Sequence, residues 1–243
     1  MAKAFKSLTF APVCKLLDYK RMFKDCKAVI FDMDGVLVDN FSCHLQAWER
    51  FCANHGIVRD RKGLLAEFGG TNRDIFTRMF KRELTDVEIK ALEDEKESLY
   101  RMLYLPQMVE VKGLSDFLEQ LRQGGYAIGM ATSAPTPNVD MVADGLNILH
   151  FFNVITDATH IQRGKPDPEI FLRCAADLGY PPHECVVFED SVSGILAAKA
   201  AGMPVIALLT THSQDELPEA NAYIKDFADA RLLRVFGKVQ GEG

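Results

Sequence analysis

The sequence predicts an α/β fold: a doubly wound parallel sheet with a helical segment inserted after its first strand. Three observations support this fold class. The apolar runs expected to form strands lack regular polar alternation, which is typical of strands covered on both faces of a parallel sheet. From residue 109 onward these runs alternate with stretches of helical periodicity. Residues 41–105 instead contain helical patterns and no convincing strand.

Five strands are expected, at residues 27–31, 126–131, 153–156, 185–188 and 204–208. Three helices should end at Gly124-Gly125, Gly179 and Gly202, because glycine commonly follows the last turn of a helix. The inserted helices are expected over residues 44–55, 72–81 and 86–103. We therefore divide the chain into an N-terminal extension (1–25), an α/β core (26–40 and 106–243) and a helical cap (41–105).

The position of the cap has a functional implication. Ligands of doubly wound sheets bind beyond the carboxyl ends of the strands. A segment inserted directly after the first strand would lie over that site as a lid, and a lid can exclude water.

The composition is ordinary for a soluble globular protein, with 48% hydrophobic and 26% charged residues. A formal charge of −6 gives no sign of a nucleic-acid partner bound through bulk charge. No apolar run approaches the roughly 20 residues that span a bilayer, so we expect no membrane partner. The N-terminus lacks the apolar core of a signal peptide, and the six cysteines lack metal-binding spacing. These features favour a cytoplasmic protein with reduced thiols, and we expect a monomer.

The segment VIFDMDGVLVDN carries the first candidate site. It places Asp32, Asp34 and Asp39 directly after an apolar strand. Carboxylates this close raise one another's pKa unless a positive partner is present. Gly35 permits a sharp change of chain direction between them. The segment therefore predicts a metal or phosphate site.

Three later strand ends carry polar residues that could act together with this acidic segment. Thr132-Ser133 follows the second strand, and Ser133 is expected to cap the next helix. Lys165 lies between turn-forming residues, and Glu189-Asp190 ends the fourth strand. Each feature alone is also typical of a helix cap, a solvated lysine or a turn. Together they would hold Mg²⁺ through oxygen ligands and present a phosphoryl group to a carboxylate.

In order, spacing and strand placement, the motifs DMDGV (32–36), Thr132, Lys165 and Glu189-Asp190 resemble those of the haloacid dehalogenase-like phosphotransferase superfamily. The resemblance covers about residues 26–230 and implies a Rossmann-like core with Mg²⁺ as cofactor.

The resemblance also implies a role for each motif residue. Asp32 would be the nucleophile that forms an aspartyl-phosphate, and Asp34 the general acid/base. Thr132 would hydrogen-bond the phosphoryl group, and Lys165 would neutralise charge there. Mg²⁺ would bind Asp32, the backbone carbonyl of Asp34, and Asp190, with Glu189 close by. On this basis we expect Mg²⁺ to lower the pKa of Asp32, and charged neighbours to raise that of Asp34.

Within the superfamily, the cap pattern most resembles the β-phosphoglucomutase-like branch. The match rests on His44 with Ala47-Trp48 after it, on Gly70-Thr71-Asn72-Arg73, and on Lys96. It implies a small phosphorylated substrate. His44 would position the acid/base chemistry of Asp34, while Arg73 and Lys96 would anchor a second phosphate. Ser133 and Trp48 complete the candidate substrate-binding set.

Each cap residue also has a purely structural interpretation. His44 could be a packed histidine, and Trp48 a residue of the cap core. Arg73 could form a surface pair with Asp74, and Lys96, in EDEKES, could lie on a solvated helix face. A further difference from the branch is Ala134-Pro135, where a serine and a lysine typically contact the phosphate of the sugar.

Two activities remain open from the sequence. The first, which the cap pattern favours, is a β-phosphoglucomutase-like mutase that converts β-glucose 1-phosphate to glucose 6-phosphate. The second is a phosphatase of the same fold that hydrolyses sugar phosphates or pyrophosphate. A catalytically silent binding protein is disfavoured because Asp32, Asp34, Lys165 and Asp190 are all present. A dehalogenase is disfavoured because Asp34 would have no acid/base task there.

Overall fold

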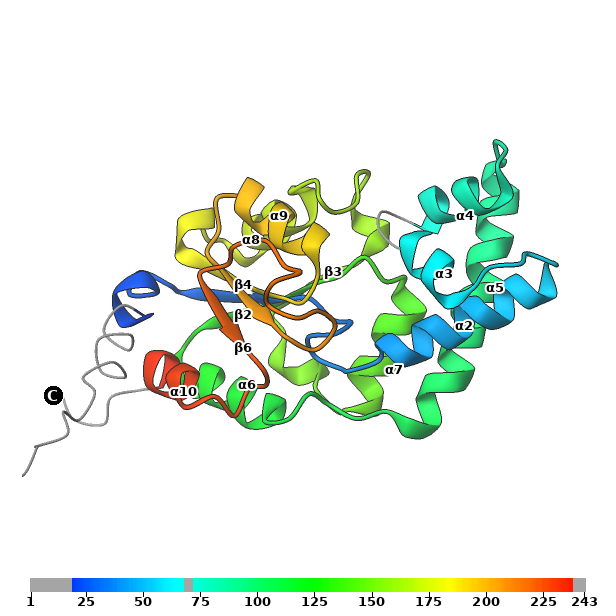
Figure 1. Cartoon of the computed structure of the whole chain (residues 1–243). Helices are drawn as coiled ribbons and strands as arrows, with labels where there is room; N and C mark the ends of the chain where they lie inside the picture. Colours follow the sequence, from blue (N-terminus) through cyan, green and yellow to red (C-terminus); the bar gives the residue numbers. More distant parts are fainter. Residues whose placement is uncertain (1–18, 68–71, 238–243) are drawn as a thin grey trace, which may run out of the picture.

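The computed structural model describes residues 19–67 and 72–237. Within them a six-stranded parallel sheet has the order β3-β2-β1-β4-β5-β6, with helices on both faces (Figure 1). This is the doubly wound α/β fold that the sequence predicts. The strands are β1 (Ala28–Phe31), β2 (Ala127–Ala131), β3 (Val154–Thr156), β4 (Cys185–Glu189), β5 (Val205–Leu208) and β6 (Ala222–Ile224).

The five expected strands are all present, and each bound lies within one residue of its prediction. Strand β6 was not predicted. Its apolar run is only the three residues AYI, and Asn221 and Lys225 flank it. Such a run is too short to show strand periodicity, so β6 depends on pairing with β5 rather than on its own sequence.

Alternate residues of the central strand β1 face different helical layers, as strand geometry requires. Val29 and Phe31 join the cluster packed under α6 and α10, whereas Ala28 and Ile30 join the cluster under α8 and α9. Figure 1 shows α8 and α9 on one side of the sheet and α6 and α10 on the other. The core helices are α6 (Leu114–Gly124), α7 (Thr136–Gly145), α8 (Glu169–Leu178), α9 (Val192–Ala200) and α10 (Ala230–Phe236).

All three predicted helix stops adopt the backbone conformation that favours glycine. Gly125 and Gly179 cap α6 and α8 with φ of +78° and +82°, and Gly202, two residues after α9, has φ of +72°, all in the left-handed region. Short 3₁₀ turns complete the connections: η1 (Leu105–Gln107), η2 (Leu149–Phe151), η3 (Ala158–His160) and η4 (Pro182–Glu184). None of the described helices combines the length and the apolar character needed to cross a membrane.

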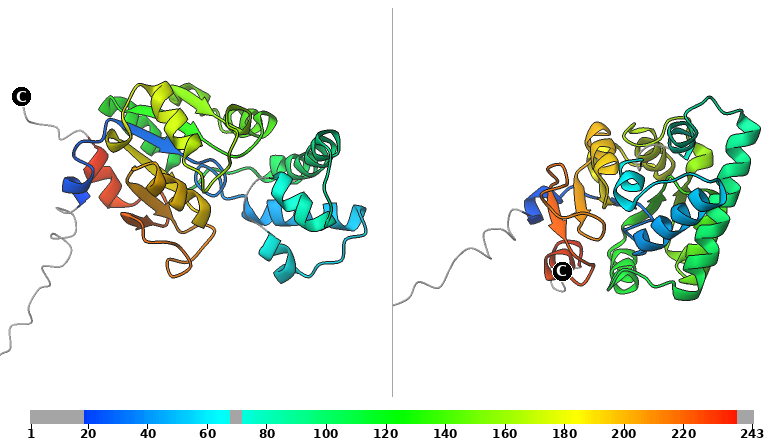
Figure 2. Two further views of the ribbon diagram at one scale, coloured as in Figure 1. Left: turned by 90° about the horizontal axis from the view of Figure 1, so that it is seen from above. Right: turned by 45° about the vertical axis from the view of Figure 1, so that its right-hand side comes forward.

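The cap lies beyond the carboxyl end of β1 (Figure 2). Its described helices are α2 (Phe41–Asn54), α3 (Arg61–Glu67), α4 (Asn72–Phe80) and α5 (Asp86–Tyr104). They enclose a separate apolar cluster that includes Leu45, Trp48, Phe51 and Phe76. Helix α3 was not predicted, because Gly63 interrupts a short and strongly charged segment. The cap helices therefore have an apolar cluster of their own, while Tyr100 and Tyr104 of α5 join the larger cluster of the core.

The N-terminal extension was assigned to residues 1–25, of which 1–18 lie outside the described residues. Residues 19–22 are helical, and Phe23 is buried against Phe236 with ring centroids 5.8 Å apart. The last part of the assigned extension therefore packs as part of the core.

A group of phenylalanines fills the space between β1, β4, α6 and α10. Phe117 is fully buried, stacks on Phe227 at 5.4 Å and meets Phe31 edge-on at 6.2 Å. Replacing Phe117 with alanine should lower the free energy of unfolding by about 3–5 kcal/mol, because the ring leaves a cavity. The control Leu172→Ala, at a side chain 39% exposed on α8, should cost less than about 1 kcal/mol. Equal losses in chemical denaturation would contradict this assignment of the core.

Candidate active site

The carboxyl ends of β1 and β4 bring three acidic residues together. The two strands are neighbours in register, with Phe31 opposite Phe188, so the residues after them meet at one edge of the sheet. One carboxylate oxygen from each of Asp32, Glu189 and Asp190 lies within 4.8 Å of the others. All three residues are buried. Asp39, which the sequence placed in the same acidic segment, is exposed and lies outside this cluster.

Lys165 supplies a positive charge at the acidic cluster. Its ammonium nitrogen lies 2.8 Å from Asp32 Oδ1 and 2.6 Å from Glu189 Oε1, and its side chain is 7% exposed. Burial lowers the pKa of the lysine, but the attraction of Asp32 and Glu189 outweighs burial and raises the pKa above its ordinary value. Lys165 is therefore a firmly held cation beside the candidate nucleophile.

Without a metal ion, the protein groups around Asp32 do not lower its pKa. Burial and repulsion from Glu189 raise the pKa to about 7, against the opposing attraction of Lys165. Burial and the same neighbours also raise the pKa of Asp190 well above its usual range. One ammonium thus faces three buried carboxylates. This excess of negative charge and oxygen donors fits a hard divalent cation such as Mg²⁺.

The oxygens of Glu189 are already engaged. Oε1 accepts a hydrogen bond from Lys165, and Oε2 accepts from the backbone N–H groups of Asp190 and Ser191 and from the Ser191 hydroxyl. Glu189 therefore holds Lys165 and the turn after β4 in place. Asp32 and Asp190 are better suited to offer oxygens to a metal ion.

The turn after Asp34 requires glycine. Gly35 has φ of +75°, and a Cβ at this position would collide with the Asp190 carboxylate. The Thr211 hydroxyl donates to the same carboxylate, and the Thr210 hydroxyl donates to the Gly35 carbonyl. The loop after β5 thus fastens both Gly35 and Asp190.

Asp34 has a different set of partners from Asp32. Asn40 Nδ2 donates to Asp34 Oδ1 at 2.5 Å and also contacts the Tyr100 hydroxyl, while His44 Nε2 lies 3.6 Å from the same Asp34 oxygen. Burial alone would raise the pKa of Asp34, but His44 and the hydrogen bond from Asn40 outweigh it and lower the pKa. The prediction of a raised pKa was wrong, because it counted only the neighbouring carboxylates.

Thr132 and Ser133 lie at the end of β2, on the other side of β1 from the Glu189 turn. Thr132 is 1% exposed, and its hydroxyl oxygen accepts from the Ala134 backbone N–H at 3.1 Å. Ser133 is exposed and does not cap the next helix. That prediction was wrong, because α7 begins at Thr136 with Pro135 at its N-cap and without a side-chain cap.

Lys96 and His44 contact each other inside the cap. Lys96 is 3% exposed, and its ammonium nitrogen lies 3.1 Å from His44 Nδ1 and 2.8 Å from Glu97 Oε1. The solvated-face interpretation of Lys96 is therefore wrong. The His44 ring stacks on Tyr100 at 3.8 Å. Helix α2 thus presents His44 between Lys96 and Asp34.

Trp48 and Arg73 both have partners within the cap. Trp48 is 3% exposed and packs against Phe51 and Phe76 in the cap core, with Lys96 Nζ 5.1 Å from its ring centroid. Arg73 is exposed on α4 and pairs with Asp86 at 2.6 Å. Gly70 and Thr71, which belong to the same predicted loop, lie outside the described residues.

The residues of the site network that were not selected from the sequence include Asn40, Tyr100, Glu97 and Asn138. Asn40 follows the acidic segment directly, so its position was a usable signal. The other three lie on helices, and only their contacts reveal them. Glu97 accepts hydrogen bonds from Lys96, Asn72 and Asn138, the last across the boundary between cap and core.

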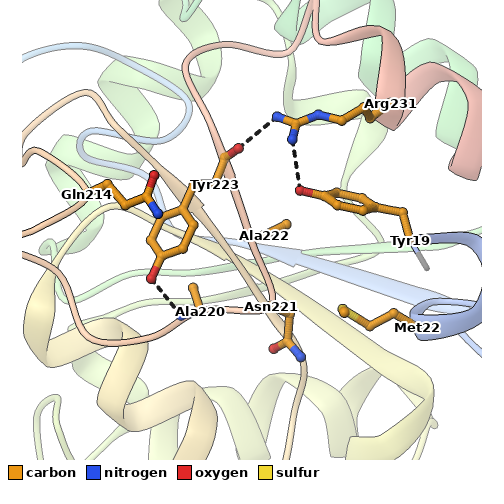
Figure 3. A pocket seen from close by; sticks show the side chains of 8 residues that line it. All are labelled: Tyr19, Met22, Gln214, Ala220, Asn221, Ala222, Tyr223 and Arg231. Atoms are coloured by element: carbon orange, nitrogen blue, oxygen red, sulfur yellow. Dashed lines mark hydrogen bonds between the residues drawn. The ribbon is translucent and has the colours of Figure 1, made fainter. Parts of the chain in front are cut away.

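A hollow lies away from the active site, at the far edge of the sheet beside β6 (Figure 3). It has a volume of about 340 Å³ and is lined in part by Tyr19, Tyr223 and Arg231. Arg231 already donates to the Tyr19 hydroxyl, the Tyr223 carbonyl and the Asp229 carboxylate. Because Asp229 neutralises the Arg231 cation, the residues that line this hollow do not form a group comparable to the acidic cluster with Lys165.

The family model described as haloacid dehalogenase-like hydrolase matches residues 29–208. This span contains every core motif of the site. The chain belongs to the haloacid dehalogenase-like hydrolase family. It is therefore an enzyme of that superfamily, with β-phosphoglucomutase-like relatives.

Two curated relatives and one solved structure illustrate the range of this family. The chain is 31% identical over 205 residues to validoxylamine A 7′-phosphate phosphatase of Streptomyces hygroscopicus subsp. limoneus, covering 84% of this chain and 96% of the relative. It is 36% identical over 193 residues to β-phosphoglucomutase of Bacillus subtilis, covering 73% and 80%. The crystal structure of a β-phosphoglucomutase from Clostridium difficile superposes with a TM-score of 0.71 at 26% identity, covering 83% and 92%.

The charge of Glu97 should stabilise the fold in a pH-dependent way. Burial tends to raise its pKa, but Lys96, His44 and hydrogen bonds prevail and lower the pKa from 4.5 to about 2. Because the folded-state pKa is the lower one, the stabilisation is present above about pH 4.5 and is lost as the pH falls toward 2. Glu97→Gln should therefore lower the free energy of unfolding by on the order of 3 kcal/mol at pH 7.

Chemical denaturation of wild type and Glu97→Gln at several pH values checks this prediction. The difference between them should shrink below about pH 4.5. A matched control is Asp94→Asn on the same helix, whose exposed pair with Lys90 should contribute less than about 0.5 kcal/mol. A difference that stays constant with pH would contradict the assignment of charge to Glu97.

Proposed function

We propose that the chain is a Mg²⁺-dependent phosphatase of small phosphorylated sugars, acting through an aspartyl-phosphate on Asp32. The observation that carries this proposal is the contact of Asp32 with Lys165 inside a buried acidic cluster at the carboxyl ends of β1 and β4. That arrangement suits a carboxylate nucleophile. Its negative charge would repel the incoming phosphoryl group, and a nearby cation neutralises the charge of both.

In the first step, a carboxylate oxygen of Asp32 attacks the phosphorus atom. A bond forms between this oxygen and phosphorus, while the bond from phosphorus to the sugar oxygen breaks. Asp34, which must first take up a proton because its pKa is lowered in the free protein, gives that proton to the leaving sugar oxygen, and Lys165 holds the nucleophile and the phosphoryl group together. In the second step, water attacks the phosphorus atom and gives a proton to Asp34. A bond forms between the water oxygen and phosphorus while the bond between Asp32 and phosphorus breaks, which releases phosphate and restores the Asp32 carboxylate.

Asp32 and Asp190 would hold Mg²⁺, and the ion would neutralise charge on the phosphoryl oxygens. The Thr132 hydroxyl and the exposed Ser133, both at the end of β2, would bind the same oxygens from the other side.

The cap favours hydrolysis over the mutase reaction. A mutase needs a cationic anchor for the second phosphate of its bisphosphate intermediate. The two candidate anchors, Lys96 and Arg73, are neutralised by Glu97 and Asp86. Ala134-Pro135 also replaces the serine and lysine of the loop after β2. The sequence alone favours the mutase, whereas these pairings favour the phosphatase.

The mutase remains the second candidate because of His44. Its imidazole lies between Lys96 and Asp34, as the resemblance to the β-phosphoglucomutase-like branch implies. If Arg73 left Asp86 when substrate bound, the exposed guanidinium would become available for a second phosphate.

Phosphorus NMR distinguishes the two candidates. The protein is incubated with Mg²⁺, β-glucose 1-phosphate and a trace of β-glucose 1,6-bisphosphate. A phosphatase releases inorganic phosphate, because water reaches the aspartyl-phosphate before the sugar returns. Accumulation of glucose 6-phosphate with little inorganic phosphate would reject the phosphatase in favour of the mutase.

Asp32→Asn should reduce hydrolysis of p-nitrophenyl phosphate by at least about 10³-fold, because an amide is a poor nucleophile. Chelation of divalent cations by EDTA should give a comparable loss that added Mg²⁺ restores. The matched control is Asp39→Asn, a nearby exposed aspartate, which should retain activity within about threefold. Undiminished turnover by Asp32→Asn would show that the assigned nucleophile is wrong.

A further inference from the structure

A buried hydrogen bond joins cap helix α5 to core helix α7. Asn138 Nδ2 donates to Glu97 Oε2 at 2.8 Å, and Asn138 Oδ1 accepts from Arg101 at 2.8 Å. Asn138 is 1% exposed and Glu97 is 4% exposed. Helix α7 starts shortly after the Thr132 loop, so this contact fixes the cap relative to the part of the core that would bind the phosphoryl group.

Glu97 extends this contact into the cap. Its other oxygen accepts from Lys96 Nζ at 2.8 Å and from Asn72 Nδ2 at 2.9 Å. A donor from the core therefore orients one carboxylate oxygen of Glu97, and donors from the cap orient the other. Since a buried carboxylate is held in one geometry only when its hydrogen bonds are satisfied, Asn138 helps to fix the position of Lys96.

The position of Lys96 determines the tautomer of His44. A lysine ammonium can only donate, so His44 Nδ1, 3.1 Å away, must be the acceptor. The imidazole then carries its proton on Nε2, the nitrogen 3.6 Å from Asp34 Oδ1. His44 Nε2 is buried and has no hydrogen-bond partner within the described part of the chain, and Asp34 Oδ1 lies just beyond hydrogen-bond distance.

We propose that Asn138 is a positioning residue: through Glu97 and Lys96 it sets the Nε2–H tautomer of His44 that faces Asp34 when the cap is closed. The proposal rests on the proposed function, in which Asp34 is the acid/base. Loss of the bond between Asn138 and Glu97 would leave Lys96, and with it the contact between Lys96 and His44 inside the cap, less firmly held.

Asparagine is well suited to this position. Its amide donates to the Glu97 carboxylate and accepts from the Arg101 guanidinium at the same time. Leucine has a similar size but can do neither. Serine is smaller and retains one hydroxyl that can donate to a carboxylate.

The test measures the imidazole nitrogens of the full-length protein by ¹⁵N NMR without substrate. The signals of His44 are assigned by their loss in His44→Gln. Wild type should show the neutral Nε2–H pattern, and Asn138→Leu should show exchange between tautomers. With p-nitrophenyl phosphate, Asn138→Leu should lower kcat about tenfold while KM changes less than about threefold.

Asn138→Ser provides a milder variant in case the leucine variant does not fold, and it should fall between wild type and Asn138→Leu in both readouts. Asp140→Asn, at an exposed position of the same helix, is the matched control and should leave both unchanged. A folded Asn138→Leu or Asn138→Ser with the wild-type His44 pattern would overturn the proposal, even if kcat fell. The NMR readout needs no turnover. If the wild-type protein were inactive but the Asn138 variants still showed the expected change of tautomer, only the proposed function would be contradicted.

Discussion

The site depends on the contact between the Lys165 ammonium and the carboxylates of Asp32 and Glu189. A buried lysine would normally tend to lose its charge, and buried carboxylates would tend to take up protons. Here the two carboxylates keep Lys165 cationic, and Lys165 attracts both of them although they repel each other, so that Asp32 is held within 2.8 Å of the ammonium. The surrounding residues serve this arrangement: Glu189 is fixed by the turn after β4, and Gly35 leaves room for Asp190.

Asp32 and Asp34 are two residues apart, yet their surroundings have opposite effects. Burial and repulsion from Glu189 raise the pKa of Asp32, while His44 and Asn40 outweigh burial and lower that of Asp34. Core residues therefore set the pKa of the candidate nucleophile, whereas residues at the start of the cap set the pKa of the candidate acid/base. This division explains why the position of the cap matters for chemistry as well as for water exclusion.

The core site was largely predictable because it depends on local motifs and on one rule of parallel sheets. Once Asp32 and Asp190 are placed after adjacent strands, the fold brings them together. The network of Glu97 and Asn138 was not predictable in this way. Glu97 lies in the charged stretch EDEKES, which resembles a solvated helix, and Asn138 lies 41 residues away on another helix. Their burial is a consequence of how the cap meets the core. Strand β6 was missed for a similar reason, since its pairing with β5 is a tertiary effect.

The central claim is that phosphate is transferred through Asp32. The most direct test is to quench a reaction mixture in acid during turnover of p-nitrophenyl phosphate with Mg²⁺ and to map phosphorylated peptides by mass spectrometry. The account predicts a phosphoryl group on the peptide that contains Asp32, and its absence in Asp32→Asn. Turnover without any phosphorylated protein, or with the phosphoryl group on another residue, would contradict the account.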